Sequence, residues 1–316
     1  MSILISVVVC THNRADLLPY ALQTLGEQSL ASNEYEVIVV DNNSTDDTRE
    51  VVEKFAHNVP NLRYCLETKT GLSHARNRGW NEARGEYVAY TDDDCKLPRP
   101  WLSVAKEIIE QKAPAVLGGP YFAFYDSPKP HWFKDSYRSR GFGDEARFLK
   151  QNEGLAGNNI FFRRALLEKF GGFAADLGMN GKQIAYGEET ELQTRMLNAM
   201  PELVIFYDPR LYVYHLVRAE RMKTGWLVRE FFAKGRYVYL TAHGNDSPAW
   251  GRIQLFLRGI KVLMEFSIDV SLGVLKRNRR QYRYFQNYYY EYTSKFVRGF
   301  GRLYAQYECL NRQQNS

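Results

Sequence analysis

The stretch GEYVAYTDDDC, residues 85–95, places three consecutive aspartates directly after an apolar run. The run has the composition of a buried β-strand. Adjacent carboxylates repel one another and resist desolvation, so the triplet is costly unless water or a cation offsets its charge. The stretch therefore predicts a strand that ends either in a metal site or in an ordinary solvated acidic turn.

Two earlier apolar runs also end in polar residues. ISVVVCT, residues 5–11, is followed by HNR, and YEVIVVD, residues 35–41, is followed by NNSTDD. Segments with helical periodicity lie between these runs. The alternation predicts an α/β fold with a mostly parallel sheet flanked by helices on both faces. In such sheets ligands bind beyond the carboxyl ends of the strands.

Further elements follow from the same periodicities. Helices are expected over residues 14–28, 44–56, 71–83 and 99–111, and strands over residues 61–67 and 115–119. Ser44 and Asp47 are expected to cap the second of these helices. No glycine-rich dinucleotide motif follows the first strand and no GxxxxGK[ST] motif occurs, which excludes the standard forms of those two nucleotide-binding folds.

The second half of the chain differs in composition and periodicity. Residues 120–144 are rich in aromatics, Pro and Gly without periodicity and are expected to form a long loop, as lids and substrate-binding segments do. Residues 154–173 predict a turn, a strand and a helix. A helix with three early glutamates is expected over residues 186–201, and strands are expected over residues 202–216.

The chain is long enough for an α/β domain, expected over residues 1–220, and an α-helical extension over residues 221–316. Its 42 basic and 36 acidic residues give a net charge of +6, and the surplus gathers late. Residues 275–302 interleave Lys and Arg with Tyr and Phe. This segment could serve anionic lipid headgroups, anionic ligands or nucleic acid, or form a solvated helical face with packed aromatics.

Several features of the sequence indicate a cytoplasmic location. The N-terminus reads as a first strand rather than a secretion signal, and the apolar residues 253–275 are interrupted by charges, so no transmembrane helix is expected. The four cysteines lie far apart with no CxxC pair, which indicates neither a zinc site nor a disulfide framework. We therefore expect a cytoplasmic protein.

Several polar side chains are candidates for ligand chemistry. On an extended backbone Asp92 and Asp94 point the same way and could hold Mg²⁺ or Mn²⁺, whereas Asp93 points elsewhere. Asp41 could accept a hydrogen bond from a nucleobase or a ribose hydroxyl. His215 is either a metal ligand, a phosphate contact or a histidine satisfied at a strand end. Asn158 either contacts a ligand or serves a turn.

Six motifs in order resemble family 2 of the inverting glycosyltransferases, which have the GT-A fold. They are SVVVCTHNR, EVIVVDNNSTDDT, GLSHARNRG, GEYVAYTDDDC, GLAGNNIFFRR and YGEETELQTR. The resemblance covers residues 2–215. It implies a nucleotide-sugar donor, a divalent metal such as Mn²⁺ or Mg²⁺ on an Asp-x-Asp motif, and a carboxylate base that acts on an acceptor hydroxyl.

The resemblance also implies roles for residues that bind the donor. Thr11, with Asn13 or Arg14, would lie in the first nucleotide-contacting loop. Asp41 matches the aspartate that binds the base of the nucleotide. Arg76 matches a position near the base and phosphates of the donor.

The same resemblance implies a metal ligand and a catalytic base. Asp94 corresponds to the direct metal ligand and Asp92 to a carboxylate on the ribose side, while Asp93 stays ambiguous because three aspartates allow a shift of register. The catalytic base falls on Glu189. Since the family commonly has Glu-Asp where this chain has Glu-Glu, Glu188 competes for that role.

The implied function is sugar transfer from a nucleotide-diphosphate donor, with a UDP-sugar favoured, to a saccharide or lipid-linked acceptor in polysaccharide or glycoconjugate biosynthesis. The basic C-terminal region could hold the enzyme at the inner face of the cell membrane, and nucleic acid is not expected as a partner. One alternative is a nucleotidyltransferase, which also needs carboxylates and a metal. The other is a non-catalytic sugar- or nucleic-acid-binding module, which leaves the aspartate triplet unexplained.

Overall fold

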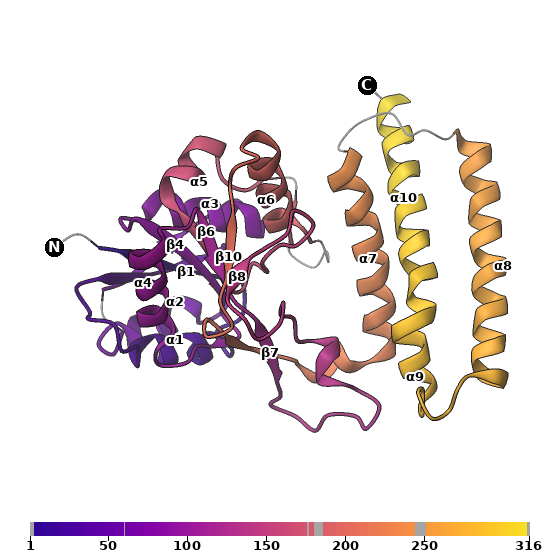
Figure 1. The fold of residues 1–316 in the computed structure, drawn as a ribbon, viewed down its shortest axis with the longest axis horizontal. Helices are drawn as coiled ribbons and strands as arrows, with labels where there is room; N and C mark the ends of the chain where they lie inside the picture. The colour runs from indigo at the N-terminus through magenta and orange to yellow at the C-terminus, as the bar shows by residue number, and fades with distance from the viewer. Residues whose placement is uncertain (1–2, 60, 176, 180–185, 244–250, 315–316) are drawn as a thin grey trace. The chain divides into compact units, whose positions relative to one another are not determined.

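The computed structural model describes residues 3–59, 61–175, 177–179, 186–243 and 251–314 (Figure 1). These residues form two compact units. The first unit draws on Met1–Phe124, Asp135–Lys182 and Glu188–Leu216. The second draws on Tyr125–Lys134, Gln183–Gly187 and Val217–Ser316.

An eight-stranded sheet forms the centre of the first unit, in the order β3-β2-β1-β4-β9-β6-β10-β8. Its strands are β1 (Ile5–Thr11), β2 (Tyr35–Asp41), β3 (Leu62–Leu66), β4 (Tyr87–Asp92), β6 (Val116–Gly118), β8 (Arg147–Phe148), β9 (Ile160–Arg163) and β10 (Ile205–Tyr207). Of these eight strands, β8 and β9 run against the direction that the others share. The predicted mostly parallel α/β sheet is confirmed.

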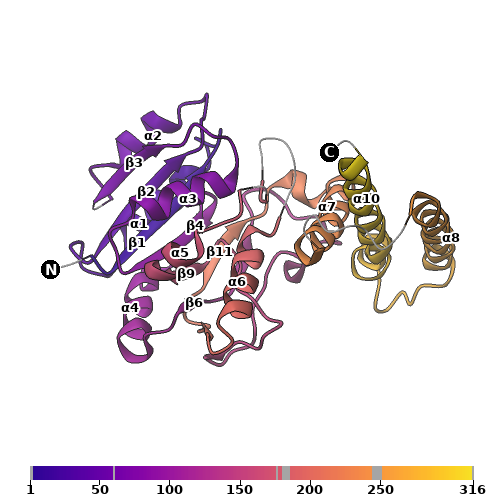
Figure 2. The ribbon, with the colours of Figure 1, turned by 90° about the horizontal axis from the view of Figure 1, so that it is seen from above.

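Helices cover both faces of this sheet (Figure 2). They are α1 (Leu18–Gly26), α2 (Thr48–Phe55), α3 (Leu72–Glu82), α4 (Trp101–Lys112), α5 (Arg164–Phe170) and α6 (Glu188–Ala199). Val7 and Val9 of β1 share an apolar cluster with α1, α2 and α4, whereas Val8 shares one with α3, α5 and α6. Burial on both faces explains why the strands read as unbroken apolar runs.

Helix α3 packs closely on the Val8 side chain of β1. A Cβ atom on Gly79 would lie 2.3 Å from Cγ1 of Val8, so only glycine permits this approach without a shift of the neighbour. The close contact fixes α3 against the sheet. Arg76, one turn earlier on the same helix, is thereby held beside the carboxyl ends of the strands.

A second, three-stranded sheet includes one strand from the segment that the sequence predicted as a long loop. Its order is β5-β11-β7, with β5 at Cys95–Lys96, β7 at Tyr121–Phe124 and β11 at Val213–Leu216. The prediction of an unbroken loop over 120–144 was wrong for β7. Its partner β11 is distant in the sequence, so no local pattern predicts this pairing.

The start of α2 also differs from the prediction. Helix α2 begins at Thr48, whose hydroxyl donates a 2.5 Å hydrogen bond to Oδ1 of Asp46. Asp47 makes no side-chain capping bond, and the Ser44 hydroxyl accepts a 2.9 Å bond from the backbone N–H of Asn13. Ser44 therefore joins two loops instead of capping the helix.

The second unit is mainly helical. Its helices are α7 (Thr224–His243), α8 (Arg252–Lys276), α9 (Phe285–Tyr288) and α10 (Ser294–Gln314). A Cβ atom on Gly235 would lie 2.0 Å from the carbonyl oxygen of Arg298, so α7 and α10 touch through their backbones. None of the helices in the described ranges is long and apolar enough to cross a membrane. The predicted C-terminal helices are confirmed, and a domain boundary at residue 220 stays a prediction.

Candidate active site

The polar ends of three neighbouring strands meet at one edge of the large sheet. In the register of the parallel strands, Thr11 of β1 lies beside Asp41 of β2, and Cys10 lies beside Asp92 of β4. The first unit thus brings these candidate residues together. The edge is the one at which α/β sheets bind ligands.

Asp41 is buried and held by two hydrogen bonds. Its Oδ1 accepts from the backbone N–H of Ser44 at 2.8 Å, and its Oδ2 accepts from the hydroxyl of Tyr64 at 2.7 Å. Burial and the bond to Asp41 raise the pKa of Tyr64 to about 12, so Tyr64 remains a donor. The sequence analysis missed Tyr64, because only the pairing of β3 with β2 places it here.

The loop after β1 is tied to the loop after β2. Asn13 has a left-handed backbone with φ of 51°, and its Oδ1 accepts a 2.7 Å bond from the N–H of Thr45. Arg14, the next residue, directs its guanidinium to the aspartate triplet. It binds Asp93 and lies 3.0 Å from Oδ2 of Asp94.

The aspartate triplet is turned rather than extended. Asp92 ends β4, while Asp93 and Asp94 form the tight turn that leads into β5. The expected extended backbone over these residues was wrong, because the chain turns here from β4 into β5, which pairs with β11. That pairing brings His215 to the triplet.

Asp92, Asp94 and His215 form a cluster of three metal-ligand atoms that lie within 4.8 Å of one another. The Nε2 atom of His215 lies 3.2 Å from Oδ1 of Asp94 and 3.7 Å from Oδ2 of Asp92. Two carboxylates and an imidazole form a donor set that fits a divalent cation. Asp93 points to Arg14 instead.

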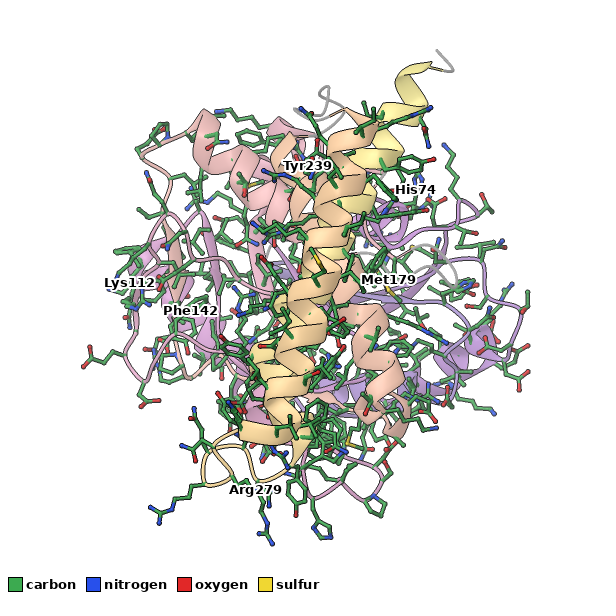
Figure 3. The ribbon with its side chains drawn as sticks, turned by 90° about the vertical axis from the view of Figure 1, so that its right-hand side faces the viewer. His74, Lys112, Phe142, Met179, Tyr239 and Arg279 are labelled. Atoms are coloured by element: carbon green, nitrogen blue, oxygen red, sulfur yellow. The ribbon has the colours of Figure 1, made fainter. Side chains whose placement is uncertain are left out.

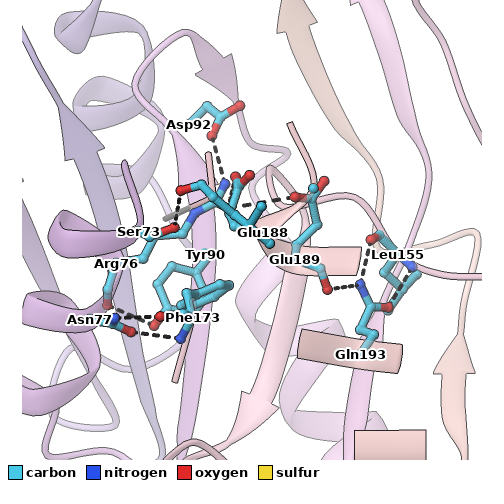
Figure 4. Close-up of polar contacts among 12 residues, drawn as sticks. Ser73, Arg76, Asn77, Tyr90, Asp92, Leu155, Phe173, Glu188, Glu189 and Gln193 are labelled. Atoms are coloured by element: carbon cyan, nitrogen blue, oxygen red, sulfur yellow. Dashed lines mark hydrogen bonds and ion pairs between the residues drawn. The ribbon is translucent and has the colours of Figure 1, made fainter. Parts of the chain in front are cut away.

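Arg76 is a buried cation beside this cluster (Figure 4). Only 4% of its surface is exposed, and its guanidinium donates a 2.5 Å hydrogen bond to Oε1 of Glu188. It lies 3.9 Å from Oδ1 of Asp92 and 4.0 Å from Oε2 of Glu189. The ring of Phe173 lies 5.3 Å from the guanidinium carbon. Contact of Arg76 with a donor stays a prediction.

The two competing glutamates are the first residues of α6 and differ in their surroundings. Glu188 is buried against Arg76, whereas the Glu189 side chain keeps 22% of its exposure. Burial, followed by the charge of Glu188, raises the pKa of Glu189 to about 7. The amide of Gln193 donates to the Glu189 carbonyl at 2.9 Å and to the Leu155 carbonyl at 3.0 Å, which fixes the first turn of the helix.

The neighbouring asparagines before β9 also differ. Asn159 donates to the Pro120 carbonyl at 3.0 Å and accepts from the indole N–H of Trp101 at 3.0 Å, so it is bound within the core. Asn158 is buried, and its Oδ1 has no hydrogen-bond partner among the residues that the structure describes. Asn158 is therefore the one of the two that retains an acceptor.

Negative charge predominates in this site. Five carboxyl groups face the guanidiniums of Arg14 and Arg76; they belong to Asp92, Asp93, Asp94, Glu188 and Glu189. Burial, opposed by Arg14 and reinforced by Asp94, raises the pKa of Asp93 to about 7. A divalent cation bound here would be stabilising, because it would offset the excess of negative charge.

The family model described as glycosyl transferase family 2 matches residues 6–171, more than half of the chain. The chain belongs to this family and is a glycosyltransferase. The resemblance found in the sequence motifs is confirmed. Membership favours glycosyl transfer over both alternatives, the nucleotidyltransferase and the non-catalytic binding module.

Two relatives illustrate the similarity. The chain is 27% identical to a glucosyl-dolichyl phosphate glucuronosyltransferase of Haloferax volcanii over 73% of this chain and 75% of the relative. It is 28% identical to the succinoglycan biosynthesis protein ExoM of Rhizobium meliloti over 76% of this chain and 77% of the relative.

Solved structures share the fold. TarS 1–349 of S. aureus in complex with UDP-GlcNAc has a TM-score of 0.57 and 19% identity, over 99% of this chain and 92% of that one. The mannosyltransferase PcManGT of Pyrobaculum calidifontis, with GDP-Man and Mn²⁺, has a TM-score of 0.56 and 20% identity, over 99% of this chain and 75% of that one. The GT-A fold is thereby confirmed.

We predict that Glu188→Ala destabilises the first unit. The change leaves the buried guanidinium of Arg76 without its closest carboxylate, and removal of one partner from a buried pair costs about 3 kcal/mol. Urea denaturation measures the change in unfolding free energy. The control Glu168→Ala breaks the exposed pair with Arg164 and should cost less than about 0.5 kcal/mol. Equal costs for the two variants would contradict a structural role for Glu188.

We predict that Asp94→Asn weakens Mn²⁺ binding at least about tenfold, because an amide oxygen replaces a charged ligand in the Asp92, Asp94 and His215 cluster. Titration of free Mn²⁺ by electron paramagnetic resonance measures the affinity. Asp47→Asn makes the same change at an exposed position outside the cluster and should bind as the wild type does. Unchanged affinity in Asp94→Asn would refute the metal assignment.

Proposed function

We propose that this glycosyltransferase moves a sugar from a nucleoside-diphosphate donor to a hydroxyl of a saccharide or lipid-linked acceptor, with inversion at the anomeric carbon. One observation carries the proposal. The guanidinium of Arg76 lies within 4.0 Å of Oε2 of Glu189 and within 3.9 Å of Oδ1 of Asp92. A candidate base and a candidate metal-binding carboxylate thus flank a single side chain.

Glu189 is the catalytic base in this proposal. A general base must be reachable by the acceptor and must be deprotonated near the working pH, and a pKa of about 7 meets the second condition. Its 22% side-chain exposure supports the first. Glu188 is the weaker candidate, since its Oε1 is bound to Arg76.

The reaction is a single displacement. The Glu189 carboxylate takes the proton of the acceptor hydroxyl as the oxygen forms a bond to the anomeric carbon. The bond from that carbon to the diphosphate breaks, and its electron pair leaves with the nucleoside diphosphate. Attack from the face opposite the leaving group inverts the configuration. Arg76 keeps Glu189 in place through its charge.

Asp92, Asp94 and His215 would hold a divalent cation, which supplies positive charge to the leaving diphosphate when bound. We favour Mn²⁺ over Mg²⁺, because Mg²⁺ prefers a shell made of oxygen ligands and His215 offers nitrogen. The Mn²⁺ in the related mannosyltransferase structure agrees with this choice.

Donor binding is assigned to the loops at the same edge of the sheet. We propose that Asp41 accepts a hydrogen bond from the nucleobase and that Asn158 contacts the donor sugar with its Oδ1. Thr11 and Asn13 line the first loop, and Arg14 contacts the phosphates. A UDP-sugar is favoured, which the UDP-GlcNAc complex of the structural relative TarS supports.

The acceptor belongs to polysaccharide or glycoconjugate biosynthesis in this proposal. The relatives that act on glucosyl-dolichyl phosphate and in succinoglycan biosynthesis support it. We place the enzyme in the cytoplasm, at the inner face of the cell membrane. All four cysteines are free thiols, which suits a reducing compartment.

We predict that Glu189→Gln lowers turnover by about 10²–10⁴-fold while donor affinity changes little, since the amide cannot accept the proton. Release of UDP from UDP-glucose in the presence of acceptor measures turnover, and calorimetry measures donor affinity. Glu191→Gln is the matched control, because it lies on the same helix, has 23% side-chain exposure and pairs with Arg195. Turnover of Glu189→Gln within a few-fold of the control would sink the assignment of the base.

We predict an acidic limb in the pH dependence of kcat/KM with a midpoint near 7. The pKa of Glu189 is raised to about 7, so the carboxylate form needed for proton removal is lost as the pH falls through that value. Steady-state kinetics between pH 5 and 9, a range set by about two units on either side of the midpoint, measures the limb. Glu191→Gln should retain it. A midpoint near 4.5 would show that Glu189 titrates as an ordinary carboxyl.

A further inference from the structure

Helix α8 exposes an apolar stripe along its whole length. The stripe consists of residues with at least 40% exposure; they are Ile253, Phe256, Leu257, Ile260, Leu263, Met264, Ile268, Leu272, Val274 and Leu275. Ile253 at one end is 77% exposed and Leu275 at the other is 75% exposed. At 1.5 Å per residue the stripe is about 33 Å long. Surface helices of globular proteins normally present polar residues to water.

The opposite face of α8 is already used for packing in the second unit. Asp269 is buried and accepts hydrogen bonds from Tyr288 at 3.0 Å and Thr293 at 2.6 Å. The ring of Phe266 lies 6.4 Å from that of Phe296 on α10. Since this face is fixed inward, the apolar stripe cannot turn inward as well. Figure 3 looks onto α8, with Arg279 in the loop at its lower end.

Positive charge accompanies the stripe. Residues 252–283 contain eight basic and two acidic residues, a net charge of +6 from eight minus two. Of the two acids, Asp269 is buried and Glu265 lies 3.8 Å from Nζ of Lys261. Four arginines follow the helix within seven residues, at 277, 279, 280 and 283. The cations thus gather beside the apolar surface and at one end of it.

We propose that α8 and the arginine loop after it form a docking surface for an anionic lipid membrane. The apolar stripe would enter the boundary between headgroups and acyl chains, with the helix parallel to the membrane plane. The arginines would contact lipid phosphates. Nucleic acid would suit the cations but not ten apolar side chains. The proposal deepens the membrane location given under the proposed function by naming the surface responsible, and its vesicle test is separate from the tests of sugar transfer because it concerns the second unit.

The test is flotation of the full chain with vesicles of phosphatidylcholine, alone or mixed equally with phosphatidylglycerol. We expect binding to the mixed vesicles that weakens with added salt. The double variant Phe256→Gln/Ile268→Gln should bind at least about tenfold more weakly. The control Val228→Gln/Val238→Gln alters two exposed apolar residues on α7, outside the stripe, and should bind as the wild type does. Arg279→Gln/Arg280→Gln should lose the preference for phosphatidylglycerol.

Circular dichroism melting of each variant tests whether weaker vesicle binding comes from unfolding. We expect unchanged melting, because all of the altered apolar side chains are exposed. Equal vesicle binding by Phe256→Gln/Ile268→Gln and the control would overturn the proposal. The proposal would also be overturned if the wild type did not bind vesicles but formed a dimer by light scattering, and if Phe256→Gln/Ile268→Gln abolished that dimer. A second copy of the chain would then cover the stripe.

Discussion

The buried guanidinium of Arg76 is the interaction on which the site depends. Burial of a single charge is prohibitive without partners, and Arg76 has Glu188 in direct contact and Asp92 and Glu189 within 4.0 Å. Arg76 lies on α3 and these partners lie on β4 and α6, and α6 is more than a hundred residues from Arg76 in the sequence. One side chain therefore links the cluster of Asp92, Asp94 and His215 to the start of α6. The glycine at position 79 permits this arrangement by letting α3 approach β1.

The same arrangement leaves a surplus of negative charge. Two guanidiniums face five carboxyl groups, so the net charge of these seven groups is −3 (two minus five) when all of them are ionised. Such a cluster can lower its energy by taking up protons or by holding a divalent cation. The raised pKa values of Asp93 and Glu189 are the first response. The proposed reaction would use both responses, because its base would titrate near neutrality while its leaving group carries negative charge.

The fold was largely predictable because its signals are local. Buried strands with polar ends, helical periodicity and motif order all lie in short segments. The turn at Asp93 and Asp94 was not predictable, since it follows from the pairing of β5 with β11, more than a hundred residues later. The contact of Tyr64 with Asp41 and the pairing of β7 likewise depend on partners that no local pattern shows. The apolar run in α8 was visible, but which of its faces is exposed depends on packing within the second unit.

The adjacent glutamates at the start of α6 have different surroundings although they are consecutive residues. Successive side chains on an α-helix point about 100° apart, so Glu188 and Glu189 approach Arg76 unequally, at 2.5 Å and 4.0 Å. Glu188 faces inward and binds Arg76, and its charge adds to burial in raising the pKa of Glu189. A sequence comparison treats the pair as a choice between two bases. In the folded chain the two differ, because the buried Glu188 binds the arginine while Glu189 is only partly buried.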